Sequence, residues 1–124
     1  MELVSKRFAD TVVLLPRGRI DHATAEQFKA ALAPHLAACA AGRDRVVIDM
    51  AGVEYISSVG LRVLMLASKQ AKAQGGPLAV CGLQPVVREI FEISRFNLVL
   101  QVFPSLREAL TALSTDALAA FGAA

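Results

Sequence analysis

The chain has only two cysteines and two histidines, and it lacks the common motifs of hydrolytic and phosphate-binding sites. Its two cysteines, Cys39 and Cys81, form no CxxC pair and have no metal-ligand spacing, which favours a reduced, cytosolic chain. A GxSxG nucleophile elbow is absent because Ile56 stands where its first glycine would precede Ser58. The chain also has no GxxxxGK loop for binding phosphates. We therefore expect no enzyme, no cofactor and no bound metal.

Two local patterns with acidic residues have ordinary structural interpretations. Asp21 and His22 are adjacent, which suits a helix cap followed by a surface histidine better than a catalytic pair. Asp44, Asp49 and Glu54 come nearest to a carboxylate cluster. We interpret them as loop and strand-end residues and not as a metal site.

Charge and hydropathy exclude further classes of protein. The net charge is only +2, and Lys6-Arg7 is the one adjacent basic pair, so the sequence predicts no nucleic-acid surface. No apolar run approaches the roughly 20 residues of a membrane span. The first residues lack the charged-then-apolar order of a signal peptide. We expect a soluble, cytoplasmic protein with no direct membrane insertion.

What the chain does contain is an alternation of apolar segments. With 55% hydrophobic residues, the 124 residues suffice for one globular domain, 1–124. Strands followed by helices predict an α/β fold with a mostly parallel sheet, one antiparallel edge strand and four helices. We expect Pro34 to kink or end the first helix and the alanine-rich tail after Asp116 to fray. The predicted strands are Leu3–Phe8, Thr11–Leu15, Arg45–Met50, Pro77–Cys81 and one within Asn97–Phe103, and the predicted helices follow Thr24, span Leu61–Gln74, begin at Pro85 and follow Ser105.

The most informative stretch is the junction where the buried strand Arg45–Met50 passes through a short loop into the long helix. Ser57 and Ser58 stand where this helix begins. Serine is a preferred helix N-cap, so one of the two has an ordinary structural explanation. The second hydroxyl is then spare, and Gly60 lets another backbone come close to it. A phosphate on Ser58 would add about −1.5 to −2 charge, which a helix N-terminus tolerates.

The long helix itself predicts an inner and an outer face. Leu61, Leu64 and Ala71 fall on the inner face, and Arg62 points outward. Met65 or Leu66 lies near the outward stripe. Met65 either contributes to a protein-binding face there or packs under a loop.

Two segments resemble signatures of one family. Ile56–Arg62, preceded by Val46–Met50, resembles the central motif of the STAS domain, and in particular that of the bacterial anti-sigma factor antagonists. Gly18–Ala25 is similar to the second signature of that family, a Gly-x-Leu/Ile-Asp segment before the first helix. The resemblance covers essentially the whole chain and implies a STAS fold.

The resemblance also implies a phosphorylation switch. In that family the antagonist binds an anti-sigma factor that is also a serine kinase, the kinase phosphorylates the antagonist at the junction, and a metal-dependent serine phosphatase reverses this. The usual pattern is Asp-Ser-Ser/Thr-Gly-Leu, so alignment on Gly60-Leu61 makes Ser58 the phosphorylated residue, with Ser57 as the fallback. Ser57 then replaces the aspartate, and Val59 replaces the second hydroxyl. The expected partner-binding residues are Asp21, Ser57, Val59, Gly60, Arg62 and Met65.

The sequence therefore predicts a cytoplasmic anti-sigma factor antagonist, a phosphoprotein of transcription regulation that works by partner switching. The alternative is a structural STAS subunit of a membrane transporter or lipid-trafficking complex, in which the junction is never phosphorylated.

Overall fold

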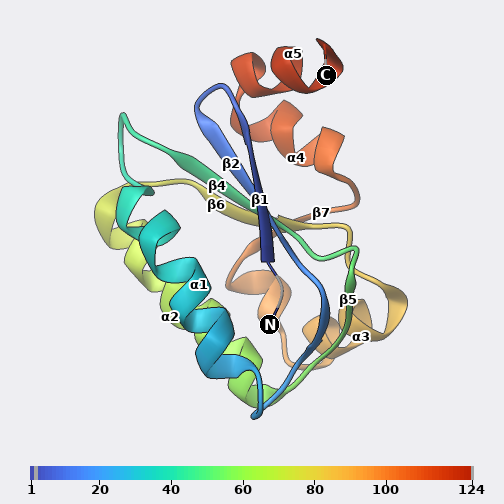
Figure 1. The fold of residues 1–124 in the computed structure, drawn as a ribbon. Helices are drawn as coiled ribbons and strands as arrows, with labels where there is room; N and C mark the ends of the chain where they lie inside the picture. Colours follow the sequence, from blue (N-terminus) through green and yellow to red (C-terminus); the bar gives the residue numbers. More distant parts are fainter. Residues whose placement is uncertain (2, 124) are drawn as a thin grey trace.

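The computed structural model describes residue 1 and residues 3–123, and within them two sheets are surrounded by helices (Figure 1). In this part of the chain the main sheet has five strands in the order β1-β2-β4-β6-β7, and the small sheet pairs β3 with β5. The strands are β1 (Leu3–Phe8), β2 (Thr11–Pro16), β3 (Gly18–Ile20), β4 (Arg45–Asp49), β5 (Val53–Ile56), β6 (Leu78–Cys81) and β7 (Gln101–Phe103). The helices are α1 (Ala25–Ala38), α2 (Ser58–Gln74), α3 (Pro85–Ile93), α4 (Leu106–Leu113) and α5 (Thr115–Ala123), with a 3-10 helix η1 (Phe96–Leu98).

The predicted α/β class and sheet are confirmed. Strand β1 is antiparallel to β2, and the β2–β4, β4–β6 and β6–β7 pairs are parallel. The short turn between β1 and β2 permits the antiparallel edge, whereas the helical crossovers return the chain in the same direction.

Both faces of the main sheet are covered. Helices α1 and α2 lie against one face, and α4 and α5 lie against the other (Figure 1). In β4, Val46 and Ile48 join the core on the α1–α2 side, whereas Val47 joins the core on the α4–α5 side. All three side chains are fully buried, which explains why their run is continuously apolar.

Three features differ from the sequence prediction. Helix α1 continues through Pro34 to Ala38, so an early end at this proline is wrong. Phe28, Leu32 and Leu36 are buried, and their packing holds the helix together on both sides of the exposed proline. A proline inside a helix costs about 3 kcal/mol, which this burial offsets.

The second difference is an additional helix, because the alanine-rich tail forms α5. The described residues therefore hold five α-helices, where the sequence predicted four. Ala117 is fully buried, and the rings of Phe121 and Phe8 meet edge to face at 5.5 Å. Ser114 starts the helix by accepting a hydrogen bond from the N–H of Ala117 at 3.1 Å.

The third difference concerns strands. Residues 53–56 were expected to be loop, yet they form β5, which pairs in parallel with β3. The last strand β7 is confined to Gln101–Phe103, and η1 occupies the residues before it. The small sheet carries the chain from the end of β4 to the start of α2, so it determines where the two serines lie.

Candidate functional site

The junction is built where β3 and β5 end side by side. Ile20 is paired with Ile56 in the small sheet, and the N–H of Ser57 donates to the carbonyl of Ile20 at 2.8 Å. Asp21 and Ser57 therefore leave the ends of two neighbouring parallel strands, which is a usual place for function in open α/β folds. The sequence placed both residues at the site, but only the strand pairing brings them together.

The two serines have different structural positions. The Oγ of Ser57 accepts a hydrogen bond from the N–H of Gly60 at 3.3 Å, and the Ser57 backbone is extended, as in an N-cap. Ser58 is the first residue of α2, and its side chain is exposed. The expectation that one serine caps the helix while the other keeps a spare hydroxyl therefore agrees with the structure, with Ser57 as the cap.

Gly60 lies underneath the junction and not on its surface. A methyl group added at Gly60 would sit 2.7 Å from Cγ1 of Ile56 and 2.8 Å from Cγ2 of Ile20. Both isoleucines are buried, so the glycine allows α2 to begin directly against the small sheet. Gly60 itself is buried, and it supports the site from below.

The outward side of the junction forms a shallow hollow of about 400 Å³. Val59 is 43% exposed, Arg62 is exposed and Met65 is half-buried. Met65 also packs against the edge of the core, so it is neither fully exposed nor fully buried. The residues that line the hollow are Ser58, Val59, Leu61, Arg62, Met65 and Phe96.

Phe96 is the lining residue that sequence reasoning missed. It lies in η1, far from the junction in sequence, and only 6% of it is exposed. Its ring meets that of Phe91 edge to face at 5.2 Å. No local motif marks Phe96, because its place beside α2 depends on how the chain returns from α3 to β7.

Asp21 organises the loop before α1. Its Oδ1 accepts from the N–H of Ala23 at 3.0 Å, and its Oδ2 lies 3.7 Å from Nε of Arg19. Desolvation raises the pKa of Asp21, but it is outweighed by backbone hydrogen bonds from Ala23 and Thr24 together with the charge of His22 and the Thr24 hydroxyl, so the pKa is lowered. The N-cap of α1 is Thr24, whose side chain bonds to the loop and not to a helical N–H. The predicted side-chain cap on this helix is therefore wrong, although both residues do structure its start.

The rest of the described chain offers little reactive chemistry. Burial raises the pKa of the Cys81 thiol to about 12, with a further contribution from the charge of Asp49, and burial also raises the pKa of Cys39. Thiols with raised pKa values are poor nucleophiles. Over residue 1 and residues 3–123, no three His, Cys, Asp or Glu side chains gather as metal ligands.

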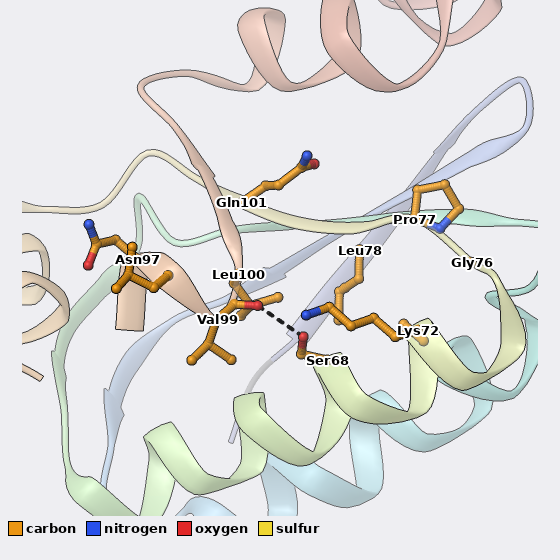
Figure 2. A pocket seen from close by; sticks show the side chains of 11 residues that line it. Ser68, Lys72, Gly76, Pro77, Leu78, Asn97, Val99, Leu100 and Gln101 are labelled. Carbon is orange, nitrogen blue, oxygen red and sulfur yellow. Dashed lines mark hydrogen bonds between the residues drawn. The ribbon is translucent and has the colours of Figure 1, made fainter. Parts of the chain in front are cut away.

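A second hollow, of about 430 Å³, lies at the far end of α2 (Figure 2). It separates α2 from the segment that holds η1 and the start of β7. A hydrogen bond joins the two segments, because the Oγ of Ser68 donates to the carbonyl of Val99 at 3.2 Å (the dashed line in Figure 2). Lys72 extends toward it from α2, whereas the side chain of Gln101 points away from α2. The Ser68 hydroxyl is already engaged in holding these segments together, so this hollow does not present a free hydroxyl as the junction does.

Comparison with known proteins agrees with this arrangement. A family model described as STAS domain matches residues 3–109. BtrV of Bordetella bronchiseptica, which its name assigns to the anti-sigma factor antagonists, is 41% identical over 120 residues, covering 95% of this chain and 98% of BtrV.

Solved structures with low identity share the fold. A crystal structure of an anti-sigma factor antagonist from Mycobacterium paratuberculosis has a TM-score of 0.81 at 24% identity, covering 90% of this chain and 92% of that one. A Thermotoga maritima protein assigned to the same class has a TM-score of 0.80 at 20% identity, covering 90% and 93%. In the described part of this chain, no helix is both long enough and apolar enough to cross a bilayer.

Proposed function

The chain belongs to the STAS domain family, and from this premise we propose that it is an anti-sigma factor antagonist controlled by phosphorylation of Ser58. In the proposed cycle, which takes place in the cytoplasm, the unphosphorylated chain binds an anti-sigma factor that is also a serine kinase. The kinase transfers phosphate to Ser58, the complex separates, and a serine phosphatase restores the hydroxyl. The chain itself catalyses no step, and Ser57 is the fallback acceptor.

The observation that carries this proposal is that the two serines have different roles in the structure, since Ser57 caps α2 and Ser58 is exposed. Because the Oγ of Ser57 already accepts the N–H of Gly60, the exposed Ser58 hydroxyl is free for a kinase without loss of the helix cap. The name of a relative that is 41% identical supports the class of function.

The surroundings of Ser58 explain how one phosphate would act. Val59 and the half-buried Met65 give the hollow an apolar part, and Arg62 adds a cation. A partner that covers this hollow would remove the Ser58 hydroxyl from water. Covering a phosphate of about −1.5 to −2 charge would be far more costly than covering a neutral hydroxyl. Phosphorylation would therefore weaken binding while leaving the fold intact, because the helix N-terminus tolerates the charge.

The test compares Ser58→Ala with Ser58→Glu. Each variant is used to capture partners from a lysate of the source cell, and the partner retained by Ser58→Ala is then purified for calorimetry. We expect Ser58→Ala to bind it and Ser58→Glu to bind at least about tenfold more weakly, since 1.4 kcal/mol of lost contact corresponds to this factor. Equal affinities for the two variants would contradict the switch.

The chain contains a matched control for the charge change. Thr115 is the exposed first residue of α5, directly after the capping Ser114, so it repeats the geometry of Ser58 after Ser57 on the other face of the main sheet. Thr115→Glu should leave partner affinity unchanged.

If Ser58→Ala and Ser58→Glu instead retain the same transporter components, the alternative of a structural STAS subunit is favoured.

A further inference from the structure

Helix α2 concentrates positive charge that nothing in the helix balances. Its sequence holds Arg62, Lys69 and Lys72 and no Asp or Glu, although the net charge of the whole chain is only +2. In residue 1 and residues 3–123, the ion pairs belong to Arg7, Arg19 and Arg45. Arg62 thus has no acidic partner in this part of the chain.

Arg62 is also the member of this set that shares a hollow with Ser58. The two residues are four apart in one helix, so their Cβ atoms lie about 5–6 Å from each other on the same face. Lys69 is eleven residues from Ser58, which places it about 16 Å further along the helix axis. Ser57 adds no negative charge beside Ser58, and the first turn of α2 contains no acidic residue.

We propose that Arg62 is the internal counter-ion of phosphorylated Ser58, so that phosphorylation withdraws Arg62 from the partner-binding face at the same time as it adds negative charge. This proposal rests on the proposed function for the identity of the modified serine. A phosphate offers three acceptor oxygens, and a guanidinium offers a planar fork of donors that matches two of them. After phosphorylation, a partner would therefore meet the phosphate anion and would also no longer be able to contact the Arg62 cation.

In the described part of the chain, the elements next to the hollow offer few other cations that could pair with this phosphate in place of Arg62. Arg19 stacks over the ring of Tyr55 at 4.5 Å and also lies beside Asp21. Glu54 in β5 is exposed, but it is an anion and does not attract a phosphate. Arg95 directly precedes η1, and Phe96 of η1 lines the hollow. Arg95 is therefore the second cation to test.

The experiment installs phosphoserine at position 58 during expression of the full chain, so it needs neither the kinase nor the partner. The ³¹P resonance of the phosphate is followed over pH in the wild type and in Arg62→Gln, Lys69→Gln and Arg95→Gln variants. A paired cation favours the dianion, so the second pKa of the phosphate should be about half a unit higher in Arg62→Gln than in the wild type. Lys69→Gln and Arg95→Gln should leave it unchanged, and Arg62→Lys should give an intermediate value, because a lysine keeps the charge but not the fork.

Two results would overturn the proposal. Equal phosphate pKa values in the wild type and Arg62→Gln would show that Arg62 does not pair with the phosphate. An equal rise in Arg62→Gln and in either control would show a diffuse positive field instead of a specific pair. Circular dichroism of the unphosphorylated variants checks that each folds, as expected for exposed side chains. Because no partner is involved, failure here leaves the partner-binding test of Ser58→Ala and Ser58→Glu unaffected.

Discussion

Replacing Gly60 by alanine tests how the junction is held together. The new methyl group would meet Cγ1 of Ile56 at 2.7 Å, Cγ2 of Ile20 at 2.8 Å and the carbonyl oxygen of Ile20 at 3.1 Å. Both isoleucines are buried, at 1% and 0% exposure, so neither can swing into solvent. The carbonyl of Ile20 is also fixed, because it accepts the N–H of Ser57. The small sheet and the start of α2 must therefore move apart.

Two effects of opposite sign determine the magnitude. Overpacking of a closely packed core costs about 1–3 kcal/mol, whereas alanine is favoured over glycine within a helix by about 1 kcal/mol. Three contacts at or below 3.1 Å put the steric cost at the upper part of its range. We expect a net loss of about 1–2 kcal/mol in the free energy of unfolding, which for a chain of this size lowers Tm by about 4 °C per kcal/mol.

Urea unfolding followed by circular dichroism measures this change. The matched control is Gly122→Ala in α5, where an added methyl group meets nothing within 4 Å and helix propensity alone should act. This control should be as stable as the wild type or slightly more so. If Gly60→Ala were as stable as the wild type, the close approach of α2 to Ile20 and Ile56 would not constrain the junction.

Two further predictions concern residues whose hydrogen bonds involve a capping serine. Ser57→Ala should lower the free energy of unfolding by about 1 kcal/mol, because the N–H of Gly60 loses its acceptor, whereas Ser58→Ala should not; equal losses in urea unfolding would contradict the assignment of Ser57 as the cap. The hydroxyl of Ser114 donates to Asp10 at 2.6 Å, and this bond is the largest of the effects that lower the pKa of Asp10 below 3.8, while burial opposes them. Charged Asp10 therefore stabilises the fold above its ordinary pKa, and that contribution is lost as the pH falls from there through the lowered pKa of the folded state. Asp10→Asn should be less stable near neutral pH and should lose less stability in acid; parallel stability curves between about pH 7 and about pH 2 would refute this linkage.

Much of the fold could be predicted because its signals are local. The run Val46-Val47-Ile48 identified a strand buried on both faces, and the short turn before Thr11 identified the antiparallel edge. The helix predicted to follow Ser105 is α4, and the Oγ of Ser105 accepts the N–H of Glu108 at 3.2 Å. Each of these signals depends on residues within a few positions of one another.

The errors arose where distant contacts override local preference. Pro34 opposes a helix by its own chemistry, yet the buried residues on both sides of it keep α1 intact. The alanine-rich tail has a weak amphipathic pattern, and its helix depends on packing of Phe121 against Phe8 at the opposite end of the chain. Residues 53–56 are too short a segment to be identified alone, and they become a strand because β3 lies alongside.

The same division applies to the site. The sequence by itself determined that two hydroxyls stand at the start of a helix and that Arg62 follows one turn later, because helix caps and four-residue spacings are local properties. Only the tertiary structure decided that Ser57 is the cap and Ser58 is exposed, that Gly60 is wedged between Ile20 and Ile56, and that Phe96 closes one side of the hollow. Those outcomes depend on which strands pair and on where η1 returns to the sheet, and such contacts join residues that the order of the chain leaves far apart.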